Sequence, residues 1–130
     1  MNSIKAVFWD FGGVITTSPF DSFNLYEEKH GLEKDFIRRV NSTNPDSNAW
    51  AKLERNQIDL SEFNDLFLNE STNLGYPIQG VDVISLLQGQ IRPEMVQALE
   101  AIKGNLIQAC LTNNIVSPET QLSDQNVSIA

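Results

Sequence analysis

The hydrophobic pattern near the start of the chain predicts a buried strand that ends at a carboxylate. Residues 6–9 are apolar at successive positions, and Asp10 and two glycines come soon after. An unbroken apolar run is typical of a strand covered on both faces, as in a parallel sheet. Ligands of such sheets bind beyond the carboxyl ends of the strands, where Asp10 would lie. Gly12 and Gly13 would let the backbone turn tightly and present its amides to a bound group. The alternative is an Asp that only caps the turn after a strand.

Helical patterns dominate the segment that follows this strand. Ser18 would cap the first helix, Pro19 would occupy its first position, and Asp21 would complete a capping box. The helix is predicted to end at Gly31, which suits the left-handed backbone conformation, with His30 near the negative end of the dipole. We expect a structural role for His30, which is the only histidine of the chain.

Apolar spacing indicates which face of each early helix is buried. Phe20, Phe23 and Tyr26 lie three positions apart and would form a buried stripe on the first helix. A second helix is predicted over residues 32–40, followed by a polar loop over residues 41–47.

The later helices have stronger local signals. A short helix is expected with Trp50 and Leu53 on its inner face. Asp59 and Glu62 have the spacing of a capping box and would open a longer helix that ends before residues 75–77. The buried positions of that helix would be Phe63, Leu66 and Phe67, and a further short buried helix is predicted over residues 81–87.

The remaining pattern predicts one more helix and a second strand. Pro93 would begin the helix and Gly104 would end it, with apolar residues at helical spacing between them. The apolar run over residues 106–112 follows directly and leads into Thr112 and Asn113. The order of strand, helices and strand predicts an α/β fold.

Small polar residues follow both predicted strands. If the two strands are neighbours in a parallel sheet, Asp10, Gly12, Gly13, Thr112 and Asn113 would surround one crevice. A threonine hydroxyl and adjacent backbone amides can bind the oxygens of a phosphoryl group. A carboxylate at the centre could then attack phosphorus or hold Mg²⁺. An ordinary turn after the second strand is the alternative for its Thr-Asn-Asn sequence.

Composition and charge narrow the class of partner. The chain has 130 residues, of which 41% are hydrophobic, and a formal net charge of −8. This balance argues against nucleic acid and against an anionic membrane surface as the main partner, because both need a basic surface. A small anionic substrate remains compatible with it. Cys110 is the only cysteine, which favours a reducing, cytoplasmic compartment, and no signal peptide or membrane-spanning run is recognised.

Two short motifs carry a resemblance to a known family. Residues 10–14, Asp-Phe-Gly-Gly-Val, resemble the first motif of the haloacid dehalogenase-like hydrolase superfamily, and residues 111–114, Leu-Thr-Asn-Asn, resemble its second. Residues 50–58 and the Glu-Phe pair at 62–63 are similar to a segment of the helical cap that a large subgroup inserts between these motifs. Within the superfamily, the chain resembles the capped branch that contains the phosphatase domain of soluble epoxide hydrolase.

The resemblance implies a fold and a chemistry. The fold would be a Rossmann-like core, represented in part by residues 1–16 and 91–130, with a helical cap over residues 17–90. Asp10 would be the nucleophile of an aspartyl-phosphate mechanism and a ligand of Mg²⁺, and the backbone carbonyl of Gly12 would be a second ligand. The phosphoryl group would be held by Thr112, Asn113 and Gly13. The substrate would be a small phosphorylated metabolite, and the cap would close over it and exclude water.

The chain departs from the family pattern at two points. Most phosphatases of the superfamily have an acidic residue two positions after the nucleophile as general acid, and here that position is Gly12. The lysine of the third motif and the acidic residues of the fourth would lie beyond the second motif. The resemblance therefore implies a truncated domain whose catalytic site is incomplete, so that the isolated chain is expected to have little or no activity. The open edges of a two-stranded core would favour self-association.

Two other functional classes remain. A non-catalytic binding or regulatory remnant of the same fold is favoured by Gly12 and by the missing motifs, and it predicts no turnover. A receiver-like phosphoacceptor domain also uses an aspartate at a strand end with Mg²⁺. It would need an acidic pair after the first strand and short strand–helix repeats, whereas this chain has a single aspartate and a long helical insertion there.

Overall fold

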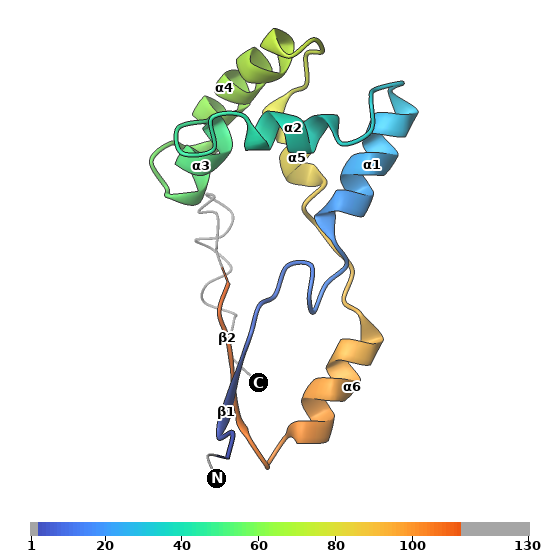
Figure 1. Ribbon diagram of the computed structural model, residues 1–130, viewed down its shortest axis with the longest axis vertical. Coiled ribbons are helices and arrows are strands. Elements are labelled where there is room, and N and C mark those ends of the chain that lie inside the picture. The colour runs from blue at the N-terminus through green and yellow to red at the C-terminus, as the bar shows by residue number, and fades with distance from the viewer. Residues whose placement is uncertain (1–2, 113–130) are drawn as a thin grey trace.

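The structure is a computed structural model that describes residues 3–112 (Figure 1). It is a mixed α/β arrangement in which one strand comes first, six helices follow, and a second strand comes last. The elements are β1 (Ala6–Trp9), α1 (Pro19–Lys29), α2 (Phe36–Ser42), α3 (Ala49–Glu54), α4 (Leu60–Asn73), α5 (Gly80–Ser85), α6 (Pro93–Ile102) and β2 (Ile107–Cys110). Helices α1–α5 gather at one end of the molecule, and the two strands lie with α6 at the other (Figure 1). Within the described range, no helix is both long enough and apolar enough to cross a bilayer.

The hydrophobic core lies among the helices α1–α5. Phe63 and Phe67 of α4 are fully buried, and their ring centroids are 5.5 Å apart. Trp50 of α3 meets Phe63 edge-on, with centroids 6.1 Å apart. The predicted capping box of α4 is confirmed, since the Glu62 amide donates to Asp59 Oδ1 at 2.8 Å and the Asp59 amide donates to Glu62 Oε2 at 3.0 Å.

The start of α1 is confirmed in part. Ser18 is the N-cap and Pro19 the first helical residue, but the Ser18 hydroxyl accepts from the amide of Phe20 at 3.3 Å. The predicted capping box with Asp21 is therefore not formed. Gly31 adopts the left-handed conformation, at φ +66°, as the sequence predicted.

Helix α2 begins later than its hydrophobic pattern predicts. Glu27 of α1 is 1% exposed, and its carboxylate accepts the amides of Asp35 at 2.8 Å and Ile37 at 2.9 Å. These bonds cap the N-terminus of α2 from another helix. Asp35 takes the left-handed conformation at φ 64°, so the predicted helix over residues 32–40 is wrong in its first turn.

The two strands pair in parallel, which confirms that predicted arrangement. Ala6 lies opposite Ile107 and Trp9 lies opposite Cys110, so the carboxyl ends of both strands are level. Gln108 links this sheet to α6, because its Nε2 donates to the carbonyl of Leu99 at 3.0 Å.

The prediction that both faces of the first strand are covered is wrong for the described residues. Phe8 is 65% exposed and Ile107 is 72% exposed, whereas Val7 and Trp9 are half-buried. The half-buried residues Val7, Trp9 and Gln108 lie on one side of the sheet, where Gln108 bonds to α6. No element of residues 3–112 covers Phe8 and Ile107 on the other side. The apolar run correctly indicated a strand but overstated its burial.

Two connections run side by side between the strand end of the molecule and the cluster of helices α1–α5 (Figure 1). Thr16 and Ile91 form an antiparallel bridge, and the Arg92 amide donates to the carbonyl of Ile15 at 2.8 Å. A Cβ on Gly89 would lie 3.0 Å from the Thr17 carbonyl oxygen, so a larger residue there would push the two backbones apart.

Candidate functional site

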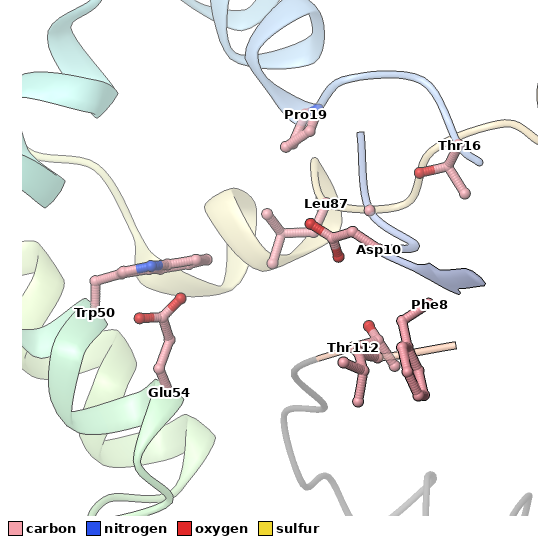
Figure 2. A pocket seen from close by; sticks show the side chains of 10 residues that line it. Phe8, Asp10, Thr16, Pro19, Trp50, Glu54, Leu87 and Thr112 are labelled. Carbon is pink, nitrogen blue, oxygen red and sulfur yellow. The ribbon is translucent and has the colours of Figure 1, made fainter. Parts of the chain in front are cut away.

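A cavity of about 720 Å³ separates the carboxyl ends of the strands from helix α3. Figure 2 shows side chains from both sides facing it, with Asp10, Thr112 and Phe8 opposite Trp50 and Glu54. The cavity is therefore built by residues that are far apart in the sequence. Its lining consists of Phe8, Asp10, Gly12, Thr16, Pro19, Trp50, Glu54, Leu87, Leu111 and Thr112.

Asp10 follows β1 directly, and its carboxylate points into this cavity (Figure 2). Its Oδ1 accepts the amide of Phe11 at 2.8 Å. The other carboxylate oxygen has no hydrogen-bond partner among residues 3–112. Asp10 thus caps the turn with one oxygen and offers the second to the cavity. A turn cap and a functional carboxylate, the two interpretations of this residue, are therefore compatible.

The loop after Asp10 is a tight helical turn. The carbonyl of Phe11 accepts the amides of Val14, Ile15 and Thr16 at 3.0–3.2 Å. Because three consecutive amides bond to this one carbonyl, the backbone is held in a compact turn immediately after the strand.

The two glycines of this loop differ in what they offer the cavity. Gly13 has φ +78°, and its amide donates to the Thr16 hydroxyl at 3.1 Å. The amide that was expected to bind a phosphoryl oxygen is therefore paired inside the loop, and Gly13 is not part of the cavity lining. Gly12 does line the cavity, and a Cβ built on it would meet nothing within 4 Å.

Thr112 lies just beyond the end of β2 and lines the same cavity as Asp10. The strand pairing extends toward it, because the Leu111 amide donates to the carbonyl of Trp9 at 2.8 Å. Asn113, the remaining predicted phosphate ligand, lies outside the described residues. The structure therefore brings together Asp10, Gly12 and Thr112 of the predicted site.

Helix α3 contributes a carboxylate that the sequence analysis missed. Glu54 lies one helical turn after Trp50, and both side chains line the cavity. The signal was present in the spacing, since residues four apart share a helix face. The sequence predicts Trp50 on the inner face of this helix with Leu53, whereas Trp50 is only half-buried and also lines the cavity.

The lining is negatively charged. Asp10 and Glu54 are its ionisable residues, and none of the lining residues is basic. An anionic ligand would therefore need a cation beside it or a contact outside this lining.

The fit to Mg²⁺ depends on how many ligands the protein must supply. Residues 3–112 contain no group of three His, Cys, Asp or Glu side chains that could hold a metal ion. However, Mg²⁺ commonly keeps several waters and binds through one or two carboxylates together with substrate phosphate. The free oxygen of Asp10 and the carbonyl of Gly12 fit a site of that water-rich kind.

Comparisons with known proteins do not assign this chain to a family. Neither the protein-family models nor the curated proteins that were searched contain a match to this chain. The functional conclusion must therefore come from the chemistry of Asp10 and its neighbours.

Proposed function

We propose that the chain is a phosphatase-type hydrolase of the haloacid dehalogenase-like superfamily, acting on a small phosphorylated metabolite. The observation that carries this proposal is the position of Asp10. It lies at the carboxyl end of β1, level with the end of β2, with one carboxylate oxygen directed into a cavity that Thr112 also lines. Under the proposal, β1, β2 and α6 belong to a Rossmann-like core, and α1–α5 form the inserted cap.

The reaction would proceed in two steps on Asp10. The unpaired carboxylate oxygen attacks phosphorus and the bond to the leaving alcohol breaks, which gives an aspartyl phosphate. Water then attacks the phosphorus of this acyl phosphate and releases inorganic phosphate and the carboxylate. The Thr112 hydroxyl would donate a hydrogen bond to the transferring group, and α3 would limit the access of bulk water.

Mg²⁺ is part of the proposal. Bound by the Asp10 carboxylate and the Gly12 carbonyl, it would offset the negative charge that a phosphoryl group brings to this acidic cavity. Gly12 cannot donate a proton to the leaving group, and general acid catalysis typically contributes about 10²–10⁴-fold. We therefore expect slow turnover, fastest with leaving groups of low basicity.

The test is a covalent label on Asp10. The chain is incubated with Mg²⁺ and para-nitrophenyl phosphate or acetyl phosphate, and hydroxylamine-sensitive phosphate is located by mass spectrometry. We expect the label on Asp10, with loss of both label and turnover in Asp10→Asn. Asp21→Asn is the matched control, because it removes the same charge from an exposed position on α1. Label or turnover retained in Asp10→Asn would overturn the proposal.

A non-catalytic phosphate-binding module is the second candidate. It is favoured by Gly12 at the position of the general acid, because glycine cannot donate a proton to a leaving group. It predicts measurable binding of a phosphonate in the presence of Mg²⁺, with neither label nor turnover.

A further inference from the structure

A second cavity, of about 380 Å³, adjoins the first. Both cavities are lined by Pro19, Trp50, Glu54 and Leu87, which Figure 2 shows on the side of the first cavity that faces the helices. A ligand that fills the first cavity could therefore extend past these residues into the second. The rest of the second lining comes from α1 and α2 and consists of Phe20, Phe23, Arg38, Asn41 and Ser42.

Aromatic side chains form one wall of this second cavity. Phe20 and Phe23 have ring centroids 6.1 Å apart, and Trp50 lies on the boundary with the first cavity. The prediction that Phe20 would be buried is wrong, because its side chain is 44% exposed. Its position on the cavity wall accounts for this exposure and suits contact with an apolar part of a ligand.

Arg38 is the only basic residue that lines either cavity among the described residues. Its guanidinium carbon lies 4.2 Å from the centroid of the Phe20 ring, and its Nη1 is 3.6 Å from Asp35 Oδ1. It donates no hydrogen bond to any described residue. The guanidinium is thus positioned by stacking on Phe20 and by the ion pair with Asp35, while its remaining donors can reach a ligand.

Asn41 adds an unsatisfied polar group to the same wall. Its side-chain oxygen is buried and accepts no hydrogen bond, and its side-chain nitrogen donates none within residues 3–112. An unpaired buried carbonyl oxygen is costly, so a ligand hydroxyl that donates to it would gain free energy. An anionic ligand group could accept only from the side-chain nitrogen of Asn41. Arg38 and Asn41 lie three residues apart on α2, which places both on one face of that helix.

We propose that the second cavity binds the far end of the substrate and that Arg38 recognises a second acidic group there. The inference rests on the proposed function, which places the first phosphoryl group at Asp10. The substrate class is an elongated phosphate ester with an apolar middle, which passes Trp50 and Leu87, and a distal carboxylate or phosphate. An arginine fork pairs with either group through two parallel N–H donors.

The test measures binding, so it does not depend on turnover. Alkylphosphonic acids of increasing length are compared, with Mg²⁺ present, with phosphonoalkanoic acids and alkane bisphosphonic acids of the same lengths. Affinities are measured by isothermal titration calorimetry. At the length that spans both cavities, we expect the second acidic group to tighten binding by about 10-fold. The end group that gives the tighter binding identifies the distal anion as a carboxylate or a phosphate.

The matched pair of variants is Arg38→Gln and Arg39→Gln. Arg39 lies on the same helix and carries the same charge, but it pairs with Glu33 at 2.7 Å and does not line the cavity. Arg38→Gln should abolish the advantage of the second acidic group, and Arg39→Gln should keep it. Thermal unfolding followed by circular dichroism verifies that both variants are folded.

The outcomes separate this inference from the function on which it rests. In a chain with net charge −8, a second negative charge that meets no arginine should weaken binding. Equal or weaker binding of the doubly acidic probes, or an equal effect of both variants, overturns the inference and leaves the labelling of Asp10 as the test of the chemistry. An Arg38-dependent advantage without a label on Asp10 supports the second cavity and overturns the proposed reaction.

Discussion

Thr17 and Gln90 form two hydrogen bonds with each other across 73 positions of sequence. The Thr17 amide donates to the Gln90 carbonyl at 2.8 Å, and the Gln90 amide donates to Thr17 Oγ1 at 3.0 Å. The pair holds together the two connections between the strand end and the helical cluster. It therefore helps to fix the walls of the cavity against each other.

Removing the hydroxyl of Thr17 should loosen this junction. Thr17→Val keeps the shape of the side chain but leaves the Gln90 amide without its acceptor, which should lower the free energy of unfolding by about 1 kcal/mol. Thr72→Val is the control, because its hydroxyl donates to the Leu68 carbonyl on an exposed face of α4. Urea unfolding measures both variants, and an equal loss of stability would contradict the role of the junction.

The contact between α4 and α5 depends on Gly80. A Cβ there would lie 2.7 Å from the Cα of Asn64 and 3.0 Å from the ring of Phe63. Gly80→Ala should therefore destabilise the chain by about 1–3 kcal/mol, because the buried helices cannot move apart freely. In Gly12→Ala the new methyl group meets nothing within 4 Å, so we expect little change in its unfolding midpoint.

Glu27 fixes the start of α2 through both carboxylate oxygens. In Glu27→Gln, one of the two amides that the carboxylate accepts would face an N–H₂ group at a position that is 1% exposed. We expect a loss of about 1–3 kcal/mol in the free energy of unfolding. Glu28→Gln, at the neighbouring exposed position, should change it little. A loss of the same size in both variants would contradict this account of the helix start.

Glu70 also accepts a backbone amide at the start of another helix, and its contribution to stability depends on pH. Its Oε1 accepts the Ala49 amide at 2.8 Å, and burial raises the pKa of Glu70 above 4.5, partly offset by that hydrogen bond and by Lys52. The folded chain thus holds this proton more tightly than the unfolded chain. Its stabilising contribution is complete below pH 4.5 and is lost as the pH rises through the raised pKa.

Glu70→Gln should remove this pH dependence. Glutamine keeps an acceptor for Ala49 but does not titrate, so the variant should gain stability relative to the parent chain as the pH rises. Denaturant unfolding over a series of pH values measures the difference. A difference that stays constant, or that moves toward the parent chain at higher pH, would contradict the raised pKa.

Glu54 should weaken the binding of anions in the main cavity. Its carboxylate faces the same space as Asp10 and no lining residue is basic, so Glu54→Gln should tighten phosphonate binding by about 2–5-fold at low salt. Glu100→Gln removes the same charge from α6, outside the lining, and should have little effect. Weaker binding in Glu54→Gln would instead indicate that Glu54 helps to hold a cation.

Local signals in the sequence determined much of the secondary structure. The capping box of Asp59 and Glu62, Pro19 and Pro93 at first helical positions, and Gly31 at a helix end act within one or two turns of the backbone. The parallel pairing of the strands could also be predicted, because apolar runs separated by a long helical segment favour a crossover connection.

Contacts between distant segments were decided only by the tertiary structure. Glu27 sets the first residue of α2 from another helix, and Glu54 and Arg38 reach their cavities only because α2 and α3 pack across from the strand ends. The burial of β1 was overestimated because it depends on what covers Phe8 rather than on its own residues. The sequence alone thus placed Asp10 at the end of a strand and Thr112 just beyond the other. The folded chain decided what faces them, since burial and charge at a site are set by neighbours that no local pattern encodes.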